Sequence, residues 1–161
     1  MNSYVQINTT IYDVIIIGAG AAGLMAAIHA GENGKKALII EHTAKIGEKI
    51  RISGGGRCNF TNINTTSKNF ICQNQHFVKS ALSQYTQADF INLVESYNIA
   101  YHEKTLGQLF CDGSSKQIIN MLLDECKKYH VSIKTECSVA DISKNDKFNV
   151  ESNLGNFFCN S

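Results

Sequence analysis

Glycines in the spacing GxGxxG stand near the start of the chain, and a carboxylate follows them. Gly23 closes the glycine pattern, and Glu41 lies 18 residues further on. In a dinucleotide-binding turn the first glycine allows the tight turn, the second lets a pyrophosphate approach the backbone, and the third lets the helix pack closely on the strand. A carboxylate at position 41 can accept hydrogen bonds from ribose hydroxyls and repels a 2′-phosphate. We therefore predict a dinucleotide site that includes Gly18, Gly20, Ala21, Ala22, Gly23 and Glu41.

The surroundings of this pattern support the prediction, because glycine is common and GxGxxG alone also fits an ordinary tight turn. A β-branched run over residues 12–17 precedes the glycines, and good helix formers follow them. Residues 14–30 are apolar enough to resemble a membrane span, but Asp13 precedes them and glycines interrupt them. We therefore favour a nucleotide site over a membrane span. The glycines alone leave FAD and NAD open as ligands.

A second group of candidate ligands lies in residues 47–62. Three consecutive glycines allow positive φ and an anion-binding backbone, and an arginine able to pair with phosphate follows at once. The alternative is a flexible, solvated loop. NAD-only domains normally continue here with a regular βαβ unit, whereas flavoproteins often place a long loop here, so a flavin is favoured. The candidate residues in this loop are Gly54, Gly55, Gly56 and Arg57, and Asn59, Thr61 and Asn62 add donors and acceptors able to meet the polar edge of a ring.

The order of GxGxxG, Glu41 and the run SGGGRCNFTN resembles the HI0933-like (YhiN/BaiN-like) family of bacterial NAD(P)/FAD-dependent oxidoreductases. The resemblance covers essentially all of the chain from residue 12 and extends to Gly107-Gln108-Leu109-Phe110. One departure is Cys111-Asp112, where the family usually has a proline. The resemblance implies FAD as cofactor, assigns Lys49, Arg57, Cys58 and Asn59 to the cofactor loop, and places Val139 where backbone groups hold adenine. It also implies that the chain is an N-terminal fragment, because family members are much longer.

The expected fold class is α/β, a Rossmann-type FAD-binding domain of the two-dinucleotide-binding-domain flavoprotein kind, incomplete at its C-terminus. We expect residues 1–11 to be a tail and residues 12–161 to form this domain, with a parallel sheet, a helical segment at about 74–130 and a small antiparallel meander at about 138–160. Residues 43–69 show no periodicity and are expected to be irregular. The expected helices are 21–33, 75–84, 86–97 and one after Ser114. The expected strands are 12–17, 37–40, 99–103, 108–111, 131–135, 139–143, 148–152 and 156–159.

Composition narrows the partners and the chemistry. The net charge of +1 predicts neither nucleic-acid nor membrane binding, so we expect a small-molecule substrate. The six cysteines form no CxxC pair, which argues against a zinc site and favours reduced thiols in a cytoplasmic protein. The histidines lack metal or triad spacing, and Cys58 is expected to position the loop rather than to react.

The expected function is therefore an FAD-dependent oxidoreductase in which flavin carries the chemistry. NAD(P)H is the expected electron donor and an organic compound the acceptor. The catalytic residues, the substrate and the oligomeric state are not assigned. The alternatives are an oxygen-using flavoprotein oxidase, an NAD-binding dehydrogenase domain, and a non-catalytic dinucleotide-binding module or inactive fragment.

Overall fold

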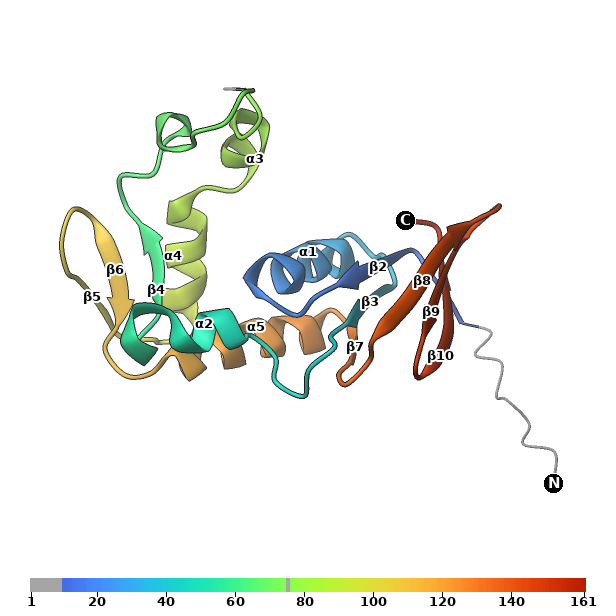
Figure 1. The fold of residues 1–161 in the computed structure, drawn as a ribbon. Helices are drawn as coiled ribbons and strands as arrows, with labels where there is room; N and C mark the ends of the chain where they lie inside the picture. The colour runs from blue at the N-terminus through green and yellow to red at the C-terminus, as the bar shows by residue number, and fades with distance from the viewer. Residues whose placement is uncertain (1–9, 75) are drawn as a thin grey trace. The chain divides into compact units, whose positions relative to one another are not determined.

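A computed structural model describes residues 10–74 and 76–161, which fall into two compact units. The terminal unit consists of Met1–Glu48 and Leu122–Ser161, and the middle unit is Lys49–Met121. The second boundary falls inside helix α5 (Ser115–Lys128). Figure 1 gives the labels of the elements.

The terminal unit contains a parallel sheet in the order β2-β3-β7, formed by Val14–Ile17, Ala37–Ile40 and Ser132–Lys134. Helix α1 (Ala21–Glu32) connects β2 to β3 and lies against both strands (Figure 1). All four residues of β3 are buried, as expected for the central strand of a parallel sheet. The predicted βαβ unit is confirmed.

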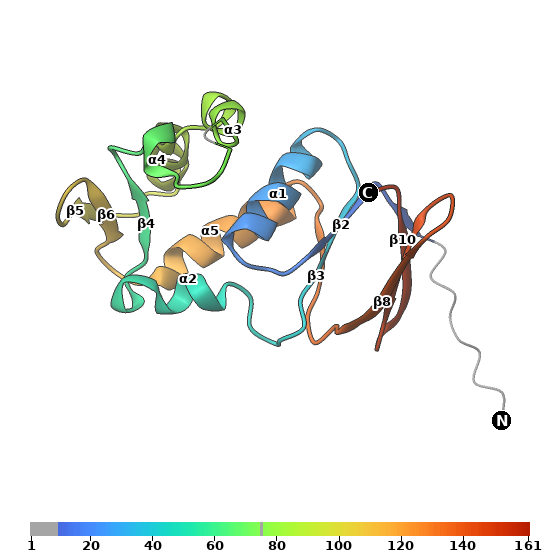
Figure 2. The same ribbon diagram turned by 45° about the horizontal axis from the view of Figure 1, so that its top comes forward.

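A second sheet of the terminal unit has the order β1-β10-β9-β8. Its β8, β9 and β10 (Val139–Lys144, Phe148–Ser152 and Gly155–Cys159) form the predicted antiparallel meander (Figure 2). Strand β1 (Ile11–Tyr12) pairs in parallel with β10. An apolar core that packs this sheet against the parallel sheet contains Tyr12, Leu38, Ile40, Cys137, Val150, Phe157 and Cys159.

The prediction of one strand over residues 12–17 was wrong, because Asp13 divides it between the two sheets. The Asp13 carboxylate accepts a hydrogen bond from Lys36 N (2.8 Å), and Asp13 N donates to Lys36 O (2.9 Å). These bonds hold Asp13 to the turn before β3, so that β1 and β2 pair with different partners.

The middle unit is built on an antiparallel sheet in the order β4-β6-β5, formed by Asn59–Asn62, Gln108–Cys111 and Tyr101–Glu103. Helix α4 (Gln87–Ser96) lies against β4 (Figure 2), where Phe60 contacts both Phe90 and Tyr101. The expectation that residues 43–69 lack regular structure was wrong. They include α2 (Glu48–Ile52), the 3-10 turns η1 (Ser53–Gly56) and η2 (Ser67–Asn69), and β4.

The helices that follow mostly confirm the sequence patterns. Thr86 caps α4, accepting from Asp89 N while the Asp89 carboxylate accepts from Thr86 N. Helix α3 (Lys79–Gln84) is shorter than the predicted 75–84, and residue 75 lies outside the described residues. Within the described ranges, no helix is long and apolar enough to cross a membrane, and no three metal-binding side chains gather.

Candidate cofactor-binding site

The turn between β2 and α1 has the geometry that its glycines predict. Gly18 adopts a φ of +104° and donates from its N–H to Ile40 O (2.7 Å), which fixes the turn on the neighbouring strand. A Cβ on Gly23 would overlap Gly18 O, so only glycine allows α1 to start this close to β2. A Cβ on Gly20 would meet nothing within 4 Å. Gly20 therefore leaves an open approach to the backbone.

The N-terminus of α1 is free to receive an anion. Its N-cap, Gly20, provides no side-chain hydrogen bond, and the first turn contains no acidic residue. Ala21 and Ala22 are exposed and carry no polar side-chain atoms. The partial positive charge and the N–H groups of this helix end therefore remain for a ligand phosphate, which fits the pyrophosphate of a dinucleotide.

Glu41 joins the glycine turn to the end of β3. Its Oε2 accepts from Ala19 N (2.9 Å), while Oε1 accepts from Thr43 N (2.9 Å) and the Thr43 hydroxyl (3.0 Å). Burial acts to raise the pKa of Glu41, but the hydrogen bonds from Ala19 and Thr43 outweigh it and lower this pKa. The carboxylate is ionised, and Oε2, which accepts only the bond from Ala19 N, keeps acceptor capacity for a ribose hydroxyl.

Thr43 is a site residue that the sequence reasoning missed. It supplies two of the hydrogen bonds that orient Glu41, and His42 Nδ1 lies 3.0 Å from the same Oε1. A hydroxyl residue two positions after a strand-ending carboxylate was the available signal, because such side chains commonly bond nearby backbone and polar groups. Gly47 N donates to Ala19 O (2.9 Å), which fixes the following loop on the glycine turn.

Val139 lies at the start of β8 in the terminal unit. It is half-buried, pairs with Ser152, and packs against the core formed around Leu38 and Ile40. The ladder between β8 and β9 is irregular directly after it, between Val139 and Asp141. Its predicted backbone contact with adenine stays a prediction.

The glycine-rich loop lies in the middle unit and is strongly curved. Gly54, Gly55 and Gly56 have φ of +58°, +67° and +88°, and Cys58 has +57°. A Cβ on Gly54 would approach Phe110 to 2.7 Å, so the loop backbone rests on that ring. Arg57 N–H and Cys58 N–H donate back to Gly54 O and Ser53 O. The positive φ values predicted from sequence are confirmed.

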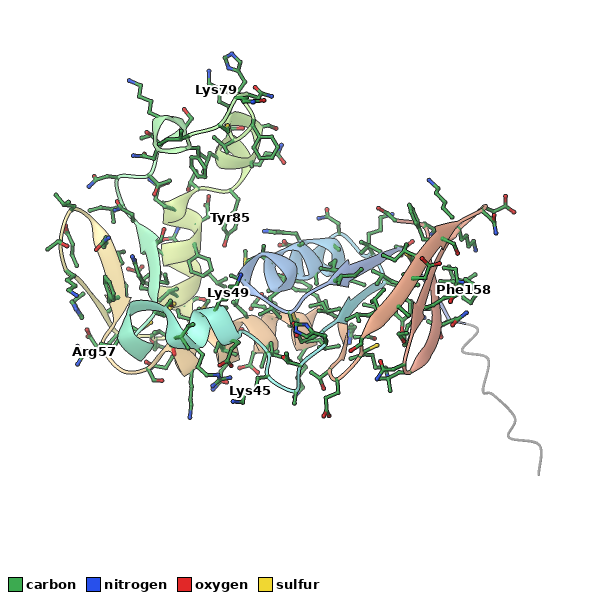
Figure 3. All side chains as sticks on the ribbon, viewed as in Figure 1. Lys45, Lys49, Arg57, Lys79, Tyr85 and Phe158 are labelled. Carbon is green, nitrogen blue, oxygen red and sulfur yellow. The ribbon has the colours of Figure 1, made fainter. Side chains whose placement is uncertain are left out.

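Two cations of this region are open to solvent. Lys49 on α2 and Arg57 after η1 are exposed (Figure 3), and neither forms an ion pair within residues 10–74 and 76–161. A free guanidinium beside a curved glycine backbone suits a phosphate. These residues and Glu41 belong to different units, so each group is a separate element of the candidate site.

Cys58 has the character of a packing residue. It is buried, and burial raises the pKa of its thiol despite a hydrogen bond from Ser53 that acts to lower it. Burial also raises the pKa of Cys111 to about 11. Both thiols are protonated near neutral pH and are weak nucleophiles. All six cysteines are free thiols.

The amides of Asn59 and Asn62 both bond within the chain. Asn59 is exposed at the start of β4, and its amide nitrogen donates to Thr61 O (3.1 Å) and Leu109 O (3.3 Å). Asn62 donates to Leu106 O (2.9 Å) and accepts from Asn64 N (2.8 Å), so its amide shapes the turn at Gly107 rather than facing a ligand. The predicted contact of Asn62 with the polar edge of a ring would compete with these two bonds.

Solved structures of flavoproteins share this fold. The chain aligns with 3-ketosteroid-delta4-(5alpha)-dehydrogenase from Rhodococcus jostii RHA1 with a TM-score of 0.64 and 12% identity, over 98% of this chain and 46% of that one. Glycine oxidase from Bacillus cereus gives a TM-score of 0.60 and 16% identity, over 93% and 55%. At such low identity the likeness establishes the fold, which is the Rossmann-type fold of FAD-binding flavoproteins.

Residues 12–161 match the family model described as HI0933-like protein Rossmann domain, and the chain belongs to this family. It is 51% identical over 135 residues to the ribosomal RNA dihydrouridine synthase of Escherichia coli K12, covering 84% of this chain and 34% of that protein. It is 29% identical over 124 residues to 3-dehydro-bile acid delta(4,6)-reductase of Clostridium scindens, covering 74% and 30%. The chain thus spans about a third of the length of these relatives.

Proposed function

We propose that this chain forms the FAD-binding part of a flavoprotein reductase that acts on uridine in ribosomal RNA. The observation that carries the FAD site is the open N-terminus of α1 behind Gly20, with the Glu41 carboxylate bonded to Ala19 N in the same turn. The RNA substrate follows from the 51% identity to the dihydrouridine synthase of Escherichia coli.

The residues of this chain bind and orient the cofactor. In the terminal unit, the α1 N-terminus would receive the pyrophosphate, Glu41 Oε2 would accept from a ribose hydroxyl, and Val139 would contribute backbone groups near adenine. In the middle unit, Arg57 with the glycines before it would pair with a phosphate or the flavin edge. Bound flavin would supply hydride-transfer chemistry. The chain shows no acid or base that we assign to catalysis.

The direction of the reaction supports NAD(P)H as electron donor. Formation of dihydrouridine adds a hydride and a proton across the C5–C6 double bond of uracil, and NAD(P)H becomes NAD(P)⁺. A reaction of this kind consumes two electrons and therefore needs a reductant. The RNA substrate and the free thiols support a cytoplasmic location.

Colour and anaerobic reduction test the cofactor and the donor. The purified protein should carry flavin bands near roughly 375 and 450 nm, and NADH or NADPH should bleach them without oxygen. A colourless protein that binds NAD and takes up no flavin would point instead to an NAD-binding dehydrogenase domain. Flavin that no nicotinamide reduces would favour a non-catalytic module.

The substrate is tested in cells. Deleting the gene should remove a dihydrouridine from ribosomal RNA, measured by mass spectrometry of nuclease fragments. The natural gene should restore it, whereas the Gly20→Val variant should not. An unchanged dihydrouridine content would contradict the RNA substrate.

A small organic enone is the second candidate substrate, because the bile-acid reductase of Clostridium scindens is also a relative. This candidate agrees with the expectation from net charge that nucleic acid is not a partner, which stays a prediction. Flavin reoxidation by an enone steroid, with ribosomal RNA unchanged by the deletion, would favour it.

A further inference from the structure

Charge is unevenly divided between the two units, although the chain as a whole is nearly neutral. The middle unit has seven lysines and arginines against four carboxylates, whereas the terminal unit has eight against ten. Within the middle unit, residues 49–88 contain five basic residues and no aspartate or glutamate. A basic stretch of 40 residues without carboxylates is the kind of asymmetry that indicates a polyanionic partner.

Residues in the range 67–79 of this stretch line a pocket between η2 and α3. Its volume is about 490 Å³, and its lining includes Lys68, Phe70, Ile71, His76 and Lys79. Lys79 lies at the first turn of α3 (Figure 3). In the described parts of the chain, neither lysine forms an ion pair. We refer to Lys68, Phe70, Ile71, His76, Phe77 and Lys79 as the arm surface.

The arm surface also exposes large apolar and aromatic side chains, which are usually buried in globular proteins. Phe70 is 43% exposed, Phe77 75% and Ile71 fully exposed. Proteins that bind single-stranded nucleic acid combine cations along the backbone with exposed aromatic rings on which bases stack. Unpaired lysines, two open phenyl rings and the absence of carboxylates meet both requirements.

From this combination we propose that the arm surface binds unpaired nucleotides of an RNA substrate, with Lys68 and Lys79 on phosphates and Phe70 and Phe77 against bases. The proposal rests on the RNA substrate proposed above and assigns a substrate-recognition surface to the middle unit. The pocket, with Ser67 and His76 in its lining, fits a polar nucleotide better than a lipid chain.

The test uses FAD-loaded protein and a fluorescein-labelled single-stranded oligouridine RNA of about 15 nucleotides, long enough for one binding surface. Fluorescence anisotropy measures affinity at several salt concentrations. The double variant Lys68→Ala/Lys79→Ala should bind about tenfold more weakly at low salt. Its log–log salt slope should be shallower by about 1.4, because two phosphate contacts are lost. Phe70→Ala and Phe77→Ala should each weaken binding by about tenfold with the slope unchanged, because they remove stacking rather than charge.

A matched control removes two exposed lysines from the terminal unit, Lys35→Ala/Lys147→Ala, and should bind RNA like the wild type. All variants should retain the flavin absorbance, which shows that they fold. An equal loss of RNA affinity in the control variant would mean that the overall charge of the protein, rather than the arm surface, determines RNA binding. This outcome would overturn the proposal.

Two further outcomes separate the proposals. If the wild type and every arm variant bind RNA equally, and the gene still supports dihydrouridine, the arm surface is wrong and the proposed function stands. If the wild type does not bind the RNA and the deletion leaves dihydrouridine unchanged, both fail. Loss of binding to phosphatidylserine vesicles in the arm variants, with RNA binding unchanged, would reassign the surface to a membrane.

Discussion

The two glycine-rich segments prepare a phosphate site in different ways. In the turn at Gly18–Gly23, the close packing of Gly23 on the backbone of Gly18 adds to the positive φ of Gly18, and the end of α1 is left open. In the loop at Gly54–Gly56, backbone angle decides, since all three residues have positive φ and the first lies on Phe110. The first segment offers a helix end as its positive partner, and the second offers the Arg57 side chain.

This contrast shows that glycine count is a poor guide to the role of a position. At Gly23 and Gly54 a side chain would clash with neighbouring atoms, whereas at Gly55 only the positive φ disfavours a side chain. Gly20 has neither restriction. Stability and cofactor affinity should therefore separate when these positions are mutated one at a time.

Gly23→Ala should have the largest effect. The new Cβ meets backbone that cannot move without distorting the turn, so we expect destabilisation of about 3 kcal/mol or more and loss of FAD. Thermal unfolding and absorbance near roughly 450 nm measure both. Gly20→Ala is the control: its Cβ has free space, so only the poorer N-cap propensity of alanine should destabilise the protein, by about 1 kcal/mol, while FAD binding should weaken. Equal destabilisation by the two substitutions would contradict the packing role of Gly23.

Gly54→Ala should follow, at about 2–3 kcal/mol, because strain at φ of +58° adds to a clash with Phe110. Gly55→Ala introduces the backbone strain of a positive φ without a clash, and should destabilise the protein by about 1–2 kcal/mol. Urea unfolding gives both values. Combining Gly54→Ala with Phe110→Leu should cost less than the sum of the two single changes, and simple additivity would show that the ring does not limit Gly54.

Glu41→Gln should destabilise the protein by about 1–2 kcal/mol at pH 7, because an amide cannot accept from both Ala19 N and Thr43 N. The lowered pKa of Glu41 means that its stabilisation is full above the unfolded value of about 4.3 and is lost as pH falls through the folded pKa. The difference between wild type and variant should thus shrink in acid. A difference independent of pH between about 7 and 3 would exclude a contribution of the ionised carboxylate.

Arg57→Ala should have the smallest effect on folding, within about 0.5 kcal/mol, because the side chain is exposed. Its effect should appear in FAD affinity, reduced by about tenfold for a lost charged hydrogen bond. Lys68→Ala, another exposed basic residue of the middle unit, serves as control and should leave FAD affinity unchanged. Flavin fluorescence on titration measures both variants.

Local patterns predicted much of the fold. Three local patterns marked their elements within one or two positions: the apolar run of β3, the capping residues Thr86 and Ser114, and the turn at Gly107. Asp13 misled the prediction because its effect depends on Lys36, which is distant in sequence. Strand β4 was missed because a polar Asn59–Asn62 run becomes a strand only by pairing with β6, about 50 residues later.

The candidate site likewise has features that local sequence predicts and features that depend on contacts between distant residues. The glycines and Glu41 follow from motif spacing, and the positive φ values follow from glycine chemistry. The support of Glu41 by Thr43, the support of Gly54 by Phe110 and the basic arm surface depend on contacts or on the division into units. The net charge of the whole chain did not indicate the basic arm surface, because the net charges of the two units have opposite signs and nearly cancel.

The bonds around Glu41 also bear on the entropy of binding. Ordering a free side chain at a binding site costs about 0.5–1.5 kcal/mol. Ala19 and Thr43 already hold the Glu41 carboxylate in one orientation within the folded chain, so a nucleotide finds its acceptor immobilised. The rotational entropy of this side chain is lost when the chain folds, so cofactor binding does not carry that entropy cost.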